Sequence, residues 1–245
     1  MATPFASLLL GWRTPEVPNV ADSDSEQSKA LAKAMLHHLG VPAGRAPGEG
    51  EAGKLLEVAV HDNLQAQLHQ VEPSQHWIVQ RGVKARQFAQ YRHLSALDDL
   101  VKSSPELRIT IGTDYLVKPD VTVGIPNDSP LTEGFPVLHA AISCKWTIRS
   151  DRVQNTRHEF NGLIRHRRGR QPHLVVVTAE PLPSRIVAIA RGTGEIDAVY
   201  HIAYEALDQA VRDVGNVGQQ GDWEECTKQH RVLPYEQLAD TLARW

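Results

Sequence analysis

Residues 137–142 form a largely apolar run in the middle of the chain, and Lys145 follows three residues later. A run of this length and character predicts a strand that is buried on both faces of a sheet. A lysine at the end of such a strand costs free energy unless something uses its charge. The pattern therefore predicts a sheet protein in which an anionic group meets Lys145 at one edge of a central strand.

Hydrophobic periodicity elsewhere predicts alternating helices and strands. Before residue 126 we expect an irregular arm over 1–24, and then a helix with Leu31 and Leu39 on one side that stops at Gly40. A Gly/Pro-rich connection over 41–53 should lead to a helix whose apolar stripe runs from Leu56 to Leu68. A strand at 77–79, a helix through Phe88 and Leu97, and a bent strand pair over 108–125 should follow. After Lys145 we expect a helix from Ser150 or Asp151 to Arg168, a strand at 174–177, a short helix from Ser184, a strand at 198–200 and a helix through Tyr204 and Val211. These elements indicate an α/β fold with a central mixed sheet flanked by helices.

The bulk properties indicate an ordinary globular chain. Its 245 residues, 41% of them hydrophobic, are enough to bury a sizeable core. We expect one domain over 1–245, with an N-terminal arm and helix over 1–52 and a core over 53–245. The two cysteines lack a CxxC spacing, which argues against a disulfide framework or a zinc site. Residues 5–12 lack a basic start and are too short to span a membrane, so we expect a cytoplasmic protein.

Positive charge is concentrated in one segment. Residues 143–170 hold eight Lys or Arg and two acids, a net charge of +6, whereas the whole chain carries −3. A solvated helix face is the usual fate of a charge run, but such faces mix the two signs. The segment therefore favours an anionic partner such as DNA.

Asp120 and Lys145 are the first candidates for catalysis. They are separated by 25 residues, which is enough to turn from one strand into its neighbour and bring both side chains to one sheet edge. Phosphodiester hydrolysis needs such a pair, because a carboxylate holds Mg²⁺ and a cation offsets the charge that develops. A PD followed by SxK is a weak motif on its own, and a chance match or a surface salt bridge is the alternative.

Further acids are needed, because the usual nuclease motif has an acid two residues before the lysine, where this chain has Ser143. Glu159 stands 14 residues after Lys145, on the helix that should begin just past the strand. The backbone carbonyl of Cys144 is a third candidate metal ligand. Glu57 interrupts an apolar stripe, either as a functional acid or as a hydrogen-bonded core glutamate.

Arg149, Asp151 and Arg152 should lie at the start of the helix that follows the catalytic strand. Arginine makes two hydrogen bonds to guanine in the major groove, and aspartate accepts from cytosine N4. In a twofold dimer this set would read a CCGG core. The alternative is a helix cap by Ser150 or Asp151 with a local ion pair.

The sequence resembles the NgoMIV family of type II restriction endonucleases, which cut sites with a CCGG core. The likeness is densest over 138–211, notably in 139–152, 175–181, 183–185 and 192–197, and weaker likeness reaches back to Asn19. It implies a PD(D/E)xK restriction-endonuclease fold with Mg²⁺ as cofactor. It also implies catalytic positions for Asp120, Lys145, Glu159 and Glu57, with Ser143 in the vacant acid position.

The resemblance further implies that Arg149, Asp151 and Arg152 read the core, and that Arg185 and Asp22 read an outer G·C pair. The expected site is GCCGGC, cut after the first G to leave a 5′ CCGG overhang. A cognate DNA methyltransferase would protect host DNA. The connection from Asp120 to Ser143 is shorter than the corresponding connection in the family, where an insertion helps to assemble a tetramer. We therefore expect at least a homodimer and leave a tetramer open.

Two other functions stay open at this point. A repair or junction nuclease would share the catalytic residues but would cut by DNA shape, with no use for Arg149, Asp151 and Arg152 as a set. A DNA-binding protein that never cuts would keep the base-reading residues and tolerate Asp120→Ala.

Overall fold

A computed structural model describes residues 4–14, 16–42, 49–112, 115–127, 134–192 and 194–244. At positions 4, 49–51 and 150–152 it describes the backbone alone. Across this part of the chain no helix is long and apolar enough to cross a membrane.

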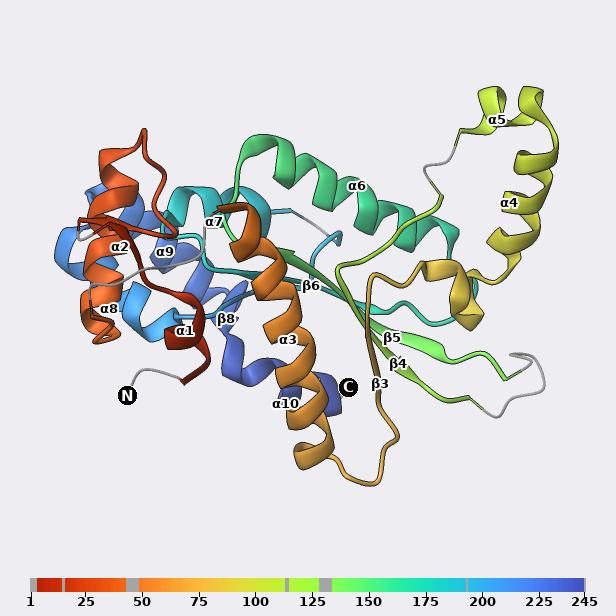
Figure 1. The fold of residues 1–245 in the computed structure, drawn as a ribbon, viewed down its shortest axis with the longest axis horizontal. Coiled ribbons are helices and arrows are strands. Elements are labelled where there is room, and N and C mark those ends of the chain that lie inside the picture. The colour runs from red at the N-terminus through yellow and green to blue at the C-terminus, as the bar shows by residue number, and fades with distance from the viewer. Residues whose placement is uncertain are drawn as a thin grey trace.

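A six-stranded mixed sheet forms the centre of the molecule (Figure 1). Its spatial order equals its chain order: β3 (Ile78–Arg81), β4 (Val121–Ile125), β5 (Val137–Lys145), β6 (His173–Thr178), β7 (Ala198–His201) and β8 (Val232–Pro234). The first three strands pair antiparallel, and the strands from β5 to β8 pair parallel. The α/β class with a central mixed sheet is therefore confirmed.

Strand β5 lies inside this sheet between an antiparallel and a parallel neighbour. All its residues from Leu138 to Cys144 are buried, which explains why the run is apolar on both faces. Only the two ends are less covered, and Lys145 is the last residue of the strand. The predicted strand, and the predicted place of Lys145 in it, are confirmed.

Helices cover both sides of the sheet (Figure 1). Helices α6 (Ser150–His166) and α7 (Pro183–Ala190) lie along one side, and α3 (Glu49–Val71) crosses the other beside α10 (Leu238–Arg244). Helix α2 (Glu26–His38) packs against α8 (Tyr204–Val214), and α9 (Val217–Lys228) packs against α7. The N-terminal segment is thereby joined to the C-terminal half of the core.

Helix α3 is longer than the sequence pattern predicts. It begins at Glu49, whereas we expected an irregular connection up to residue 53. Its buried residues recur at every fourth position, as Ala52, Leu56, Val60, Leu64 and Leu68. Ala52 extends the apolar stripe by one turn, and packing of that turn overrides the low helix propensity of Gly53.

The segment 108–125 is the clearest error of the sequence analysis. Instead of a strand pair, α5 (Pro105–Ile111) covers its beginning, and among its described residues only β4 is a strand. Ser104 accepts a hydrogen bond from the Leu107 amide, and Pro105 occupies the first helical turn. These are strong helix-start signals, and they outweigh the strand-like alternation after them.

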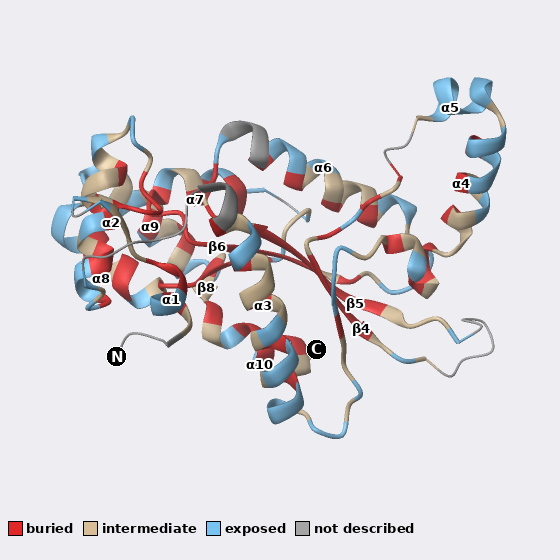
Figure 2. Ribbon diagram, viewed as in Figure 1, coloured by how far each residue is buried: buried red, intermediate tan, exposed pale blue. Residues whose placement is uncertain are grey.

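Several other predictions need smaller corrections. The helix expected through Phe88 is two short 3₁₀ turns (Ala85–Gln87 and Ala89–Tyr91) followed by α4 (His93–Ser103), and α6 ends at His166 rather than Arg168. The irregular arm contains α1 (Pro4–Leu9), β1 (Trp12–Thr14) and β2 (Val17–Pro18). Helices α4 and α5 project from the body as an arm, and α5 has no buried residue (Figure 2).

Candidate active site and base-reading surface

Asp120 and Lys145 meet at one edge of the sheet. Asp120 directly precedes β4, and Val121 pairs with Ile142 in the antiparallel ladder, so the start of β4 lies beside the end of β5. Lys145 Nζ lies 3.2 Å from Asp120 Oδ2. The same oxygen accepts hydrogen bonds from the Cys144 amide at 2.7 Å and from Ser143 Oγ at 3.4 Å. The convergence expected from the sequence is thus present, and Ser143, at the position where the usual motif has a second acid, donates its hydroxyl to Asp120.

A cavity of about 500 Å³ opens over this pair. It gathers side chains from α3, β5 and α6, together with the turn after β5. Its lining residues are Gly53, Lys54, Glu57, Asp120, Cys144, Lys145, Trp146, Thr147, Asn155 and Glu159. The structure therefore brings Glu57, Asp120, Lys145 and Glu159 to one cavity, whereas a chance motif or a surface salt bridge would not need the other two acids.

The two glutamates are held in an unfavourable electrostatic setting. Burial, and then repulsion from Asp120, raise the pKa of Glu57, although the nearby Arg81 guanidinium opposes this shift. Arg81 Nη2 lies 3.6 Å from Glu57 Oε2. Burial also raises the pKa of Glu159, with Lys145 opposing the shift and Asp120 adding to it. Asp120 thus repels both glutamates across a partly enclosed space.

This donor set fits a hard divalent cation. Carboxylate and carbonyl oxygens are the ligands that Mg²⁺ prefers, and a cation between the acids would cancel their repulsion. The amide of Cys144 points at Asp120, and because the N–H and C=O of one strand residue face the same strand edge, its carbonyl faces that edge too. Among the described residues no three His, Cys, Asp or Glu side chains are drawn close enough to hold an ion as they stand.

A second cavity of about 450 Å³ contains three of the predicted base-reading residues. Asp22 and Arg185 form an ion pair across it, and Arg149 lines it as well. The hydrogen bond from Arg185 is the main reason that the pKa of Asp22 is lowered. Residues from the N-terminal segment, the start of α6 and the start of α7 therefore meet at one place, and Ile148, Val153, Ser184 and Ala188 complete the lining.

The remaining two base-reading residues, Asp151 and Arg152, lie on the first turn of α6, and their side chains are outside the described residues. The residue at the cap position is Arg149, which makes no side-chain capping hydrogen bond. The sequence left open a helix cap at Ser150 or Asp151. In the structure Arg149 occupies the cap position instead.

Three polar residues at these cavities were not selected from the sequence. Arg81 pairs with Glu57, Asn155 lines the first cavity, and the fully buried Glu180 lies behind the second. Asn155 stands four residues before Glu159, so helical spacing could have placed both on one face. Glu180 follows the apolar strand β6 closely, which is the same kind of signal that drew attention to Lys145.

Comparison with known proteins supports one family. The model of the NgoMIV restriction enzyme family matches residues 10–133 and 127–226. The type II restriction enzyme NgoMIV of Neisseria gonorrhoeae is 39% identical over 225 residues, which cover 79% of this chain and 78% of that protein. Two structures of the restriction endonuclease Bse634I, one with cognate DNA, match at 14% identity with TM-scores of 0.43 and 0.41, covering 86% and 85% of this chain and 91% and 92% of theirs.

The resemblance noted in the sequence is thus confirmed over most of the chain. It decides against the repair nuclease and against the DNA-binding protein that never cuts. The chain belongs to the NgoMIV restriction enzyme family and is a type II restriction endonuclease.

Proposed function

We propose that this enzyme hydrolyses double-stranded DNA at the palindrome GCCGGC, after the first G, and leaves a 5′ CCGG overhang. The observation that carries the proposal is the contact of Lys145 with Asp120 in a cavity that also holds Glu57 and Glu159. The base-reading cavity adjoins it along the chain, because Trp146 and Thr147 line the first cavity and Ile148 and Arg149 line the second. A scissile phosphate in the first would place neighbouring bases near the second.

Enzymes of this family require a divalent metal in general, and Mg²⁺ is the ion we propose here. When bound, Mg²⁺ supplies a Lewis acid beside the scissile phosphate. Asp120, Glu159 and the Cys144 carbonyl would hold it, with Glu57 facing the same cavity. Ser143 keeps Asp120 in position through its hydroxyl, and Lys145 offsets the negative charge that develops on the phosphate.

The base-reading set divides into two parts. We assign the CCGG core to Arg149, Asp151 and Arg152. We assign the outer G·C pair to Arg185 and Asp22, because an arginine suits guanine O6 and N7 and an aspartate suits cytosine N4. The adjacency of these two side chains supports the assignment, since the two bases of one pair lie equally close together.

A palindromic site requires two copies of the reading surface related by a twofold axis. We therefore propose at least a homodimer on DNA, with a tetramer as the alternative assembly. We also propose that the whole chain acts as one nuclease domain in the cytoplasm, in which the arm and helix over 1–52 contribute Asp22 to the reading surface of the core over 53–245. A cognate methyltransferase would modify the same sequence in host DNA.

Digestion of a plasmid of known sequence tests the proposal. Purified protein and Mg²⁺ should produce fragments whose sequenced ends all fall at G/CCGGC. Ends at other CCGG-cored sites would contradict the roles of Asp22 and Arg185 and keep the core assignment. Ends at unrelated sites would contradict the whole recognition scheme.

A further inference from the structure

The carboxyl group of Glu180 lies at the junction of the segments that build the base-reading cavity. The residue is fully buried, and the sequence analysis gave it no role. Its Oε2 accepts the Ile148 amide at 2.7 Å, and its Oε1 accepts the Leu182 amide at 3.1 Å. Ile148 precedes Arg149, and Leu182 is the N-cap residue directly before α7. One side chain thus holds the turn that carries Arg149 and the start of the helix that carries Arg185.

The guanidinium of Arg185 is placed between two carboxylates from different parts of the chain. Its Nη1 lies 3.8 Å from Glu180 Oε2, and its Nη2 forms the ion pair with Asp22. The Asp22 side is open to the cavity, whereas the Glu180 side is closed. Glu180 therefore lies on the closed side of the arginine, within ion-pair distance of its guanidinium.

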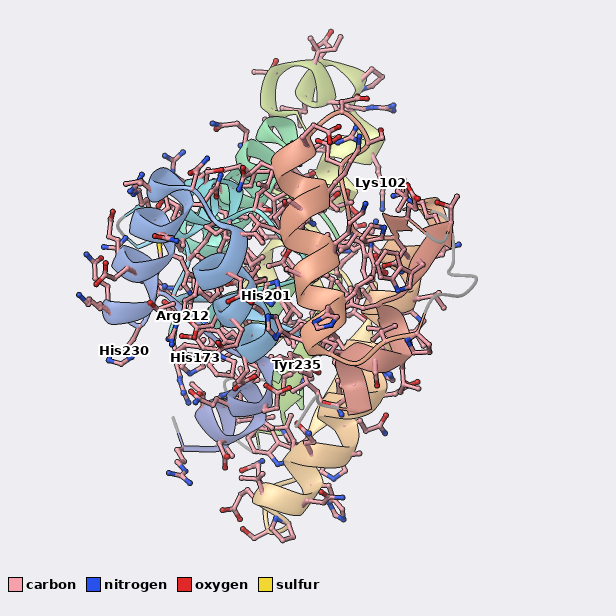
Figure 3. All side chains as sticks on the ribbon, turned by 90° about the vertical axis from the view of Figure 1, so that its left-hand side faces the viewer. Lys102, His173, His201, Arg212, His230 and Tyr235 are labelled. Carbon is pink, nitrogen blue, oxygen red and sulfur yellow. The ribbon has the colours of Figure 1, made fainter. Side chains whose placement is uncertain are left out.

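The backbone of Glu180 is itself held on both sides. Its amide donates to Thr178 Oγ1 at 3.1 Å, and its carbonyl accepts from His201 Nε2 at 3.1 Å. The Ala203 amide donates to His201 Nδ1, which fixes the neutral tautomer of that ring. His201 lies inside the molecule (Figure 3). A carboxylate this firmly held can act as a reference point for flexible arginines.

We propose that Glu180 is a positioning residue for base recognition, which holds Arg149 through the backbone of Ile148 and Arg185 through its charge, so that the two arginines keep one relative position. The inference rests on the proposed function. The negative charge of Glu180 acts on recognition of the outer base pair, because Arg185 is the base-reading side chain within ion-pair distance of it. The hydrogen bonds that Glu180 accepts from the Ile148 and Leu182 amides support both the core-reading and the outer-pair residues.

The test uses binding in Ca²⁺ to three duplexes, which contain GCCGGC, ACCGGT or an unrelated sequence. Glu180→Gln should reduce the preference for GCCGGC over ACCGGT by about 10-fold, the size of one weakened arginine–guanine contact, and should largely keep the preference for ACCGGT over unrelated DNA. In an Arg185→Ala background the same substitution should have no further effect on the outer pair. Asp98→Asn is the matched control, because Asp98 is also a buried, ion-paired acid but lies on α4.

A second measurement does not depend on the variant folding. Burial raises the pKa of Glu180 to about 7, so wild-type protein should lose outer-pair preference as the pH falls from 8 to 6. Of the other groups that face Glu180, Asp22 has a lowered pKa and stays ionised over this range, and His201, with a pKa of about 4, stays neutral. An arginine guanidinium such as that of Arg185 is not deprotonated in proteins. Arg185→Ala should remove the pH dependence.

The outcomes distinguish failure of the proposed GCCGGC specificity from failure of the positioning role of Glu180. Wild-type protein that binds all three duplexes alike would remove the proposed function and this inference together. Wild-type protein that discriminates, with Glu180→Gln equal to Asp98→Asn or with a preference that is flat from pH 8 to 6, would remove this inference alone. An equal effect of Glu180→Gln with and without Arg185 would assign Glu180 to the fold instead.

Discussion

Lys145 Nζ and Asp120 Oδ2 lie 3.2 Å apart, although Asp120 directly precedes β4 and Lys145 ends β5. The antiparallel register of β4 with β5 produces this contact, because Val121 faces Ile142. The carboxylate also accepts the Cys144 amide, so backbone and side chain of β5 hold it together. The pair is consequently a fixed feature of the sheet rather than a flexible surface ion pair.

Lys145→Ala should abolish cleavage and leave specific binding in Ca²⁺ intact. The lysine acts on the scissile phosphate in the proposed mechanism, whereas the base-reading residues line a separate cavity. Cleavage of a GCCGGC duplex and binding to it are measured on the same preparation. Lys228→Ala is the control, because that exposed lysine pairs with Glu224 on α9. Loss of specific binding together with cleavage would contradict the separation of the two roles.

Glu57→Gln should stabilise the metal-free protein at neutral pH. The pKa of Glu57 is higher in the folded than in the unfolded state, so the folded state binds the proton more tightly. The free energy of unfolding therefore falls as the pH rises from the unfolded pKa through the folded pKa. Removing the charge removes that penalty, and we expect a melting temperature about 1–4 °C higher above pH 6.

The same measurement with Mg²⁺ checks the carboxylate cluster. Wild-type protein should gain more thermal stability from the ion than Glu57→Gln does, because the ion cancels repulsion that the variant has already lost. A melting temperature of Glu57→Gln that stays below that of the wild type from pH 5 to 8 would show that Glu57 is a structural acid held by Arg81.

The parts of the site that are local in the sequence could be predicted from it. Lys145 ends an apolar strand, Glu159 lies a fixed number of helical turns beyond it, and strand pairing brings Asp120 to both. Each of these steps needs only strand or helix geometry. The ion pair of Asp22 with Arg185 is different, because it joins residues 163 positions apart, and the family resemblance suggested only that both residues read the same outer base pair.

Helix α9 and strand β8 were not predicted, because both depend on contacts between segments distant in the sequence. Helix α9 has apolar residues too sparse for a clear stripe, and it is stabilised by packing on α7 and by the buried Trp223. Strand β8 spans three residues and depends on its ladder with β7. Glu180 was assigned no role from the sequence, because its contacts with Ile148, Leu182 and Arg185 depend on the folded structure.

Leu64→Ala should destabilise the whole enzyme by about 2–5 kcal/mol, because the side chain is fully buried in the stripe by which α3 packs on the sheet. Denaturant unfolding measures this loss. The exposed Leu100 on α4 provides the control, and Leu100→Ala should change stability by less than about 0.5 kcal/mol. Equal losses of unfolding free energy in Leu64→Ala and Leu100→Ala would show that the projection formed by α4 and α5 is covered in solution.

Arg149→Ala should weaken binding to CCGG-cored duplexes by about 1–3 kcal/mol relative to unrelated DNA. The side chain is exposed at the start of α6 and lines the same cavity as Arg185, so it is placed to contact a base edge. Arg212→Ala is the matched control, since Arg212 is an exposed arginine on α8 that lines neither cavity. Competition binding at two salt concentrations separates the possible roles, because a phosphate contact would be lost equally on every duplex and would lower the salt dependence. Equal weakening on CCGG-cored and unrelated DNA would therefore move Arg149 from base reading to backbone contact.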